Sequence, residues 1–266
     1  MSGWLTGAGG GGIIPAMDST FLDRLPPAYR PAAQAILAEY SARPDVLAVL
    51  LTGSVTRGQA GATSDLDVWV LTGAAERIRR SLIVDGVPVE VFYNSLAWTE
   101  RYLAQVDVSA MNMVGYGWPA YIRPDAAGLV ADLQARARAA YEQGPPAPTA
   151  DETGRRRNLA MDTLLDAEDV LESDSVAATL VLNNALEQVL RWYYGEHRAW
   201  MPKLKRLPAD LAARDPALAA AVRAYLTAMD APARHAALLR VFALVHPAGH
   251  GLDQWCWEST PQPLSE

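Results

Sequence analysis

Two acidic residues separated by one position are the first feature of the chain that could do chemistry. Asp65 and Asp67 open an apolar run, Leu66 to Leu71, that predicts a β-strand. Alternate side chains of a strand point to the same face, so both carboxylates should lie together while Leu66 and Val68 enter a core. Mg²⁺ prefers oxygen ligands and usually keeps coordination places for phosphate oxygens. The spacing therefore predicts a magnesium site at the start of this strand.

A Gly-Ser pair stands at the end of the preceding apolar run, Val46 to Thr52, which predicts another strand. Gly53 lets the backbone approach a ligand closely, and the Ser54 hydroxyl can donate a hydrogen bond to an anion. If residues 55–59 start a short helix, its free N–H groups favour the same anion. Together with the carboxylates, the pair predicts a site for a metal ion and a triphosphate.

A third carboxylate strengthens this interpretation, because paired Asp residues also begin many exposed strands simply through their preference for turns. Glu90 lies between Val89 and Val91 in a predicted strand. An unpaired buried charge is unfavourable, and a metal held by Asp65 and Asp67 would be a partner for it. Two-metal nucleotidyl transfer uses carboxylates that bridge ions about 4 Å apart.

The rest of the pattern predicts the elements that position these residues. Asp85-Gly86 lies between two β-prone runs, residues 81–84 and 87–93, and indicates a hairpin. Helical spacing indicates helices at residues 27–43, 74–80, 95–105, 126–143 (capped by Asp125), 150–172, 176–197, 216–229 and 231–245, and residues 118–122 suit an edge strand. Thr149 and Glu152 have the spacing of a capping box. We therefore expect an α+β fold, with a mixed sheet in the N-terminal half and an all-helical bundle in the C-terminal half.

Composition shifts divide the chain into domains. We expect a glycine-rich flexible tail at 1–16, an α/β domain at 17–143, a Pro-rich linker at 144–148, a helical bundle at 149–248 and a C-terminal tail at 249–266.

The bulk composition excludes several classes of protein. The net charge of −7 argues against a protein that tracks nucleic-acid backbones, so we expect no nucleic-acid partner. Cys256 is the single cysteine, which rules out an internal disulfide. The sequence has neither a long apolar run nor the layout of a signal peptide. We therefore expect a cytoplasmic protein without a membrane partner; its oligomeric state has no signature in the sequence.

The motifs, taken in order, resemble those of the polymerase-β-like nucleotidyltransferase superfamily. They fall within residues 46–92 and comprise Gly53-Ser54, Arg57-Gly58, Ser64 to Asp67 and the Val-Glu-Val around Glu90. Within that superfamily, the chain is similar in layout to aminoglycoside adenylyltransferases. That second similarity depends on the helical C-terminal half, on Asn183 to Trp192 and on Lys203.

The resemblance implies a Mg²⁺-dependent reaction that moves AMP, or another nucleoside monophosphate, from a nucleoside triphosphate such as ATP to a hydroxyl of a small molecule and releases pyrophosphate. Aminoglycosides are the acceptor class that it suggests. Gly53 and Ser54 would hold the β- and γ-phosphates, and Ser64 would help to fix the triphosphate. Asp65 and Asp67 would bind Mg²⁺. Glu90 would complete the metal site or act as general base, and Arg57, Arg191 and Lys203 would contact the nucleotide.

Several features of the helical half have two interpretations. Arg191 and Lys203 could also simply complement a helix dipole. Asp162, Asp166 and Asp169 recur at i, i+4 and i+7, so they either receive the ammonium groups of a substrate or form a solvated helix face.

Three other activities stay open at this stage. The first is an antitoxin-like nucleotidyltransferase that modifies a protein partner, and the second is a non-catalytic nucleotide-binding module. The third follows from Arg191-x5-His197, which resembles the active motif of HEPN ribonucleases but has Trp192 where those enzymes carry a small polar residue.

Overall fold

The computed structural model describes residues 20–246 and 257–261. The predicted tail at 1–16 lies outside the described residues, and of the tail at 249–266 only residues 257–261 fall inside them. The chain forms two compact units, Met1–Gln143 and Gly144–Glu266. In the described ranges, none of the helices combines the length and the apolar character needed to cross a membrane.

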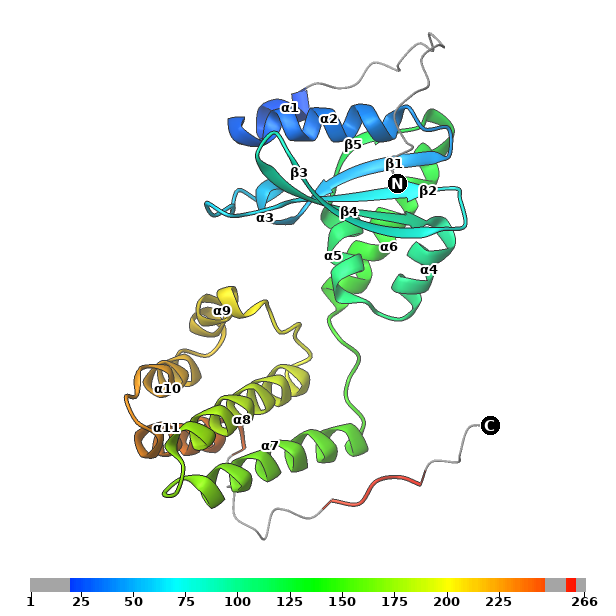
Figure 1. Cartoon of the computed structure of the whole chain (residues 1–266). Helices are drawn as coiled ribbons and strands as arrows, with labels where there is room; N and C mark the ends of the chain where they lie inside the picture. The colour runs from blue at the N-terminus through cyan, green and yellow to red at the C-terminus, as the bar shows by residue number, and fades with distance from the viewer. Residues whose placement is uncertain (1–19, 247–256, 262–266) are drawn as a thin grey trace, which may run out of the picture. The chain divides into compact units, whose positions relative to one another are not determined.

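A five-stranded mixed sheet is the centre of the N-terminal unit (Figure 1). Its strands are β1 (Val46–Thr52), β2 (Leu66–Thr72), β3 (Arg77–Val84), β4 (Val87–Ser95) and β5 (Trp118–Ile122), in the order β3-β4-β2-β1-β5. Strands β2 and β4 run parallel, and every other neighbouring pair is antiparallel. The mixed sheet confirms the expected fold class for this half of the chain.

Helices cover both faces of the sheet (Figure 1). They are α1 (Thr20–Arg24), α2 (Arg30–Ser41), α3 (Gly53–Thr56), α4 (Leu96–Ala104), α5 (Val108–Tyr116) and α6 (Ala127–Gln143), with 3-10 turns η1 (Pro27–Tyr29) and η2 (Pro124–Ala126). Because side chains alternate along a strand, Val68 and Val70 of β2 pack with the layer of α2, whereas Trp69 and Leu71 pack with the layer of α5 and α6. The sheet is therefore buried on both faces along most of β1 and β2.

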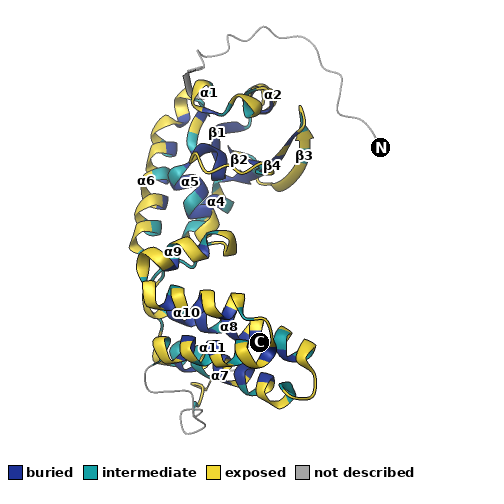
Figure 2. Ribbon diagram, turned by 90° about the vertical axis from the view of Figure 1, so that its left-hand side faces the viewer, coloured by how far each residue is buried: buried dark blue, intermediate teal, exposed yellow. Residues whose placement is uncertain are grey.

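The prediction of a helix at residues 74–80 is wrong. Residues from Arg77 onward form the edge strand β3, whose Arg77 lies opposite Asn94 and whose Val84 lies opposite Val87. The strand is mostly exposed (Figure 2), so its arginines remain in contact with solvent while its backbone pairs with β4. The predicted hairpin is confirmed: Asp85 and Gly86 have φ of 48° and 78°, the positive values that a type I′ turn requires.

Two helix starts differ from the predictions. The helix expected at 27–43 is divided into η1 and α2, with a proline in the first positions of each, where proline is well tolerated. Asp125 is not the N-cap of the helix predicted at 126–143. It lies within η2, and its carboxylate accepts hydrogen bonds from Arg123.

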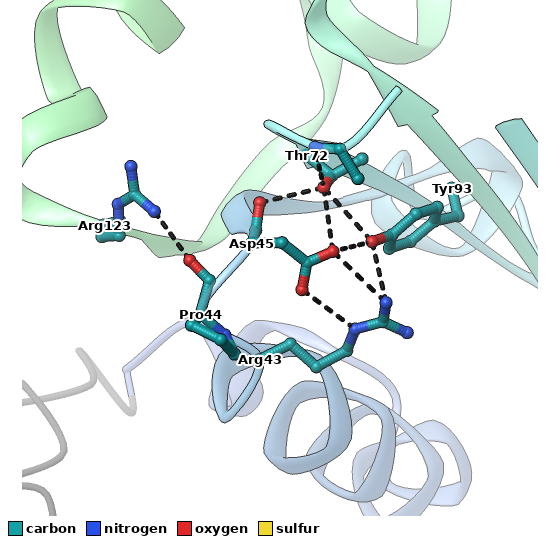
Figure 3. A network of polar contacts seen from close by, with 7 residues as sticks. Arg43, Pro44, Asp45, Thr72, Tyr93 and Arg123 are labelled. Carbon is teal, nitrogen blue, oxygen red and sulfur yellow. Dashed lines mark hydrogen bonds and ion pairs between the residues drawn. The ribbon is translucent and has the colours of Figure 1, made fainter. Parts of the chain in front are cut away.

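A polar network fastens the C-terminal end of α2 to the sheet (Figure 3). Tyr93 donates a hydrogen bond to Asp45, Arg43 Nε donates to Asp45 Oδ1 at 3.3 Å, and Thr72 Oγ1 donates to the Asp45 carbonyl oxygen at 2.9 Å. Burial alone would raise the pKa of the Asp45 carboxyl, but hydrogen bonds from Tyr93 and Arg43 lower it to about 2. These bonds join the segment between α2 and β1 to β2 and β4, at the end of β1 that lies away from Gly53.

The C-terminal unit is helical. Its helices are α7 (Ala150–Val170), α8 (Ser175–Glu196), α9 (Leu207–Arg214), α10 (Pro216–Thr227) and α11 (Ala231–Val245), with a 3-10 turn η3 (Leu204–Arg206). The capping box of Thr149 and Glu152 is confirmed at the start of α7. Helix α9 was not predicted. The core of this unit is mainly aliphatic, and it also contains aromatic side chains such as Trp192, Tyr194 and Tyr225.

Candidate metal and nucleotide site

Three carboxylates meet at the end of the sheet where β2 begins. Asp65 lies just before β2, Asp67 is its second residue, and Glu90 of β4 stands directly opposite Asp67 in the parallel register. One carboxylate oxygen of each residue lies within 4.8 Å of the other two, and all three residues are half-buried. The sheet topology therefore brings together the three acidic residues that the sequence singled out.

The geometry suits a small, hard cation. Mg²⁺ binds oxygen at about 2.0–2.1 Å, so two ligands on opposite sides of one ion lie about 4.2 Å apart. Three ligands of one octahedral ion include neighbours only about 3 Å apart, so oxygens within 4.8 Å of one another would reach a common ion through side-chain rotations that draw them closer. A donor set of carboxylates alone is typical of Mg²⁺, Mn²⁺ or Ca²⁺ rather than of softer metals. The residues present thus fit a divalent cation of this class.

Glu90 has a cationic partner within the protein. Arg79 of β3 donates from one terminal nitrogen to both carboxylate oxygens of Glu90, at 3.2 and 3.0 Å. The partner expected for this charge is supplied within the hairpin by Arg79, and a metal as a further partner stays a prediction. The Arg79 side chain is 57% exposed and that of Glu90 28%, and ion pairs this exposed contribute about 0–1 kcal/mol. Glu90 can consequently exchange this partner for a bound cation at small cost.

Gly53 is in direct contact with the carboxylate of Asp67. A Cβ atom built on Gly53 would lie 2.0 Å from Asp67 Oδ2, and the residue has a φ of +84°. Both observations require glycine here: one for the backbone conformation and the other for the space that Asp67 occupies. The short helix expected at residues 55–59 begins instead at Gly53 and is the single turn α3.

Ser54 and Ser64 hold the loop between α3 and β2. Ser54 Oγ donates to Ser64 Oγ at 3.1 Å, and the Gly61 N–H donates to Ser64 Oγ at 2.8 Å. Tyr29 Oη donates to the Ser64 carbonyl oxygen at 2.9 Å, which ties the loop to η1 as well. Arg57 donates to Asn112 of α5 at 2.8 Å. A phosphate contact donated by the Ser54 hydroxyl would therefore replace a hydrogen bond made within the protein, whereas Arg57 has further N–H donors.

A groove of about 320 Å³ borders the carboxylates. Asp65, Glu90 and Ser81 line its polar side, and its other lining residues are Leu82, Ile83, Pro88 and Val89 of the hairpin. Its volume lies at the lower end of the range for small-ligand sites, about 300–1,000 Å³. The groove therefore has room for a small molecule directly beside the carboxylates.

The predicted site residues of the helical unit have local contacts. Arg191 pairs with Glu187 one turn earlier on α8 at 2.6 Å, and Lys203 is exposed just before η3. Asp162, Asp166 and Asp169 all lie on the exposed side of α7. Their contacts with nucleotide or substrate stay predictions.

The two residues of the Arg-x5-His motif also make local contacts, and the ribonuclease alternative stays a prediction. His197 is the residue that follows α8, and its Nδ1 lies 2.8 Å from the carbonyl oxygen of Tyr193. Trp192 is 4% exposed and belongs to the bundle core.

Two residues beside the site, Arg79 and Thr52, were not predicted from the sequence. The incorrect prediction of a helix at 74–80 gave no reason to place Arg79 beside Glu90. Thr52, the last residue of β1, lies directly opposite Asp67 in the antiparallel register. Its position at the end of a buried strand, just before Gly53, was the signal that could have identified it.

Comparisons with known proteins give little further support. No family model matches the chain, and no curated protein matches it. Among solved structures, it is similar to a nucleotidyltransferase-like protein from Exiguobacterium sibiricum 255-15, with 18% sequence identity and a TM-score of 0.46. The match covers 81% of this chain and 74% of that one. A likeness at this level defines no activity, so a function must be argued from the site itself.

Proposed function

We propose that the N-terminal unit is a Mg²⁺-dependent nucleotidyltransferase domain, which transfers AMP or another nucleoside monophosphate from a nucleoside triphosphate to a hydroxyl group. One observation carries the proposal: Asp65, Asp67 and Glu90 place carboxylate oxygens within 4.8 Å of one another, at the start of β2 and on its parallel neighbour β4. The backbone of Gly53 lies against the central carboxylate. Such a cluster, with a glycine packed against its central carboxylate, fits metal-assisted transfer at phosphorus.

Each of these residues has a defined task in the proposed reaction. Bound Mg²⁺ would neutralise charge on the triphosphate and polarise the α-phosphorus. Asp65 and Asp67 would hold the cation, and Gly53 would let the phosphates approach the backbone. Glu90 would hold the cation and accept the proton of the acceptor hydroxyl. The hydroxyl oxygen would bond to the α-phosphorus while the bond from that phosphorus to pyrophosphate breaks.

The acceptor would bind in the groove beside Asp65 and Glu90. Its polar side could receive a hydroxyl or an amine, and Ile83 and Pro88 offer apolar contact on the hairpin side. Aminoglycosides are the class suggested by the resemblance described above. In that case Asp162, Asp166 and Asp169 would receive ammonium groups, and Arg191 and Lys203 would contact the phosphates.

The test is pyrophosphate release by the purified full chain with ATP, Mg²⁺ and a panel of aminoglycosides. The Asp67→Ala variant should lose turnover by at least about 100-fold, because the central ligand is removed. Glu39→Gln is the matched control: Glu39 is an exposed carboxylate of the same unit that pairs with Arg80, and this variant should retain turnover. Undiminished release by Asp67→Ala would refute the assignment. ATP labelled at the α-phosphate would show whether a small molecule or a protein receives the nucleotide.

A further inference from the structure

The side chain of Thr52, next to the carboxylate site, has a buried hydroxyl group without a hydrogen-bond partner among the residues that the structure describes. The residue is 1% exposed, and its Oγ1 has no hydrogen-bond partner in the described part of the chain. A buried polar group left unpaired destabilises the folded protein, because it has lost its hydrogen bonds to water. Such exceptions in a folded protein call for an explanation, often a ligand or a functional role.

Other buried hydroxyl and amide side chains show how unusual this is. Within residues 20–246, every other buried serine, threonine or asparagine side chain makes a hydrogen bond; they are Ser54, Thr56, Thr72, Asn94, Ser95, Thr99 and Thr163. Thr72 is the closest counterpart of Thr52, because it is also fully buried and also ends a strand of the same sheet. Its hydroxyl bonds to the Asp45 carbonyl oxygen at 2.9 Å.

The register defines which group of the site Thr52 can reach. Thr52 and Asp67 are direct partners in the antiparallel pairing of β1 with β2. Side chains directly opposite each other lie on the same face of the sheet, with Cβ atoms about 4.5–5.5 Å apart. The Thr52 hydroxyl is buried, so it can bond only to a group that lies next to it. Of the three carboxylates, that of Asp67 can reach it by a small rotation of the Asp67 side chain. In the structure, Oδ2 of Asp67 lies instead against Gly53.

We propose that Thr52 is a positioning residue for Asp67: when a divalent cation is bound, the Thr52 hydroxyl donates a hydrogen bond to one carboxylate oxygen of Asp67 and leaves the other oxygen for the cation. The inference deepens the proposed function and rests on it. Hydrogen bonds of this kind orient metal-binding carboxylates, and their loss weakens metal affinity by about 10–100-fold. The unpaired Thr52 hydroxyl is then a donor whose acceptor is the reoriented Asp67 carboxylate.

The test compares metal affinity with stability in Thr52→Val, which replaces the hydroxyl by a methyl group of similar size. Mn²⁺ alone is the probe, titrated into the full chain and followed by electron paramagnetic resonance. We expect Thr52→Val to bind Mn²⁺ about tenfold more weakly. Its unfolding midpoint without metal should be equal to or a few degrees above that of the wild type, because an unpaired buried group is removed. Thr52→Ser keeps the hydroxyl and should restore most of the affinity.

Two further variants make the outcome decisive. Thr72→Val should lower the unfolding midpoint and leave Mn²⁺ affinity unchanged, since its hydroxyl is already paired at the far end of β2. Asp67→Asn should abolish Mn²⁺ binding. If Asp67→Asn abolishes binding but Thr52→Val binds like the wild type, the inference about Thr52 fails and the metal site stands. A Thr52→Val variant that loses as much stability as Thr72→Val would also overturn it, because the role would then be structural. If Asp67→Asn binds Mn²⁺ normally, the proposed function itself fails.

Discussion

At the scale of single residues, the site depends on close contacts between side chains and backbone around Asp67. Gly53 leaves the space that the Asp67 carboxylate fills, and Glu90 stands beside that carboxylate on the neighbouring strand. Arg79 pairs with Glu90 through an exposed contact that a cation can replace. The types and spacing of Asp65 and Asp67 made the site predictable, because a strand displays alternate residues on one face. The contact of Arg79 with Glu90 was not predictable, since only the register of β3 and β4 reveals it, whereas the place of Thr52 just before Gly53 was a signal in the sequence.

Gly53→Ala should affect both the stability of the fold and the binding of the cation. A positive φ disfavours alanine by about 1–3 kcal/mol. The new methyl group would also displace Asp67 Oδ2, which lies 2.0 Å from the position that the methyl carbon would take. We expect lower stability in urea unfolding together with at least about tenfold weaker Mn²⁺ binding.

Gly58→Ala is the matched control for that variant. Gly58 has a φ of +66°, and a Cβ there meets nothing within 4 Å. It should lose similar stability but keep its Mn²⁺ affinity. Equal loss of affinity in both variants would show that the space over Gly53 does not matter for the cation.

At the scale of elements, the sheet was largely predictable except for the first residues of the edge strand β3. The strands β1 and β5 have the predicted bounds, 46–52 and 118–122, because continuous or alternating apolar residues identify a strand that is packed on helices. Strand β3 carries Arg77, Arg79 and Arg80, and its pattern resembles an exposed helix. Only its pairing with β4 decides its structure, and tertiary pairing cannot be read from a local pattern.

The network around Asp45 predicts a pH-dependent stability of the N-terminal unit. Its carboxyl has a pKa of about 2 in the folded protein, against about 3.9 in an unfolded chain. A lowered folded-state pKa stabilises the fold above about pH 4, and this contribution is lost as the pH falls toward 2. After allowance for the partial exposure of Asp45, the contribution is about 1–2 kcal/mol.

Asp45→Asn should therefore be less stable than the wild type by about this amount at pH 7, and the difference should shrink between pH 4 and pH 2. Urea unfolding of both proteins across this range is the measurement. A difference that stays constant down to pH 2 would show that ionisation of Asp45 does not stabilise the fold.

At the scale of the whole molecule, the two units hold different parts of the proposed function. The N-terminal unit carries the carboxylates, Gly53 and the groove, which support the proposed reaction. The helical unit carries Arg191 and Lys203, which would contact the phosphates, and the acidic stripe on α7, which would receive the acceptor. The composition of the chain indicated two units and a helical second half, because a Pro-rich stretch separates a β-prone region from a helical one. The acceptor could not be predicted, since it depends on side-chain geometry that no local pattern encodes.

Crystals of the full chain grown with Mn²⁺ and a non-hydrolysable ATP analogue test the central claim most directly. We predict an anomalous difference peak between Asp65, Asp67 and Glu90, with metal–oxygen distances of about 2.1–2.2 Å. We also predict phosphate oxygens of the analogue on the same ion. Mn²⁺ and analogue bound elsewhere, with these three carboxylates making no contact to the metal, would contradict the assignment of the site.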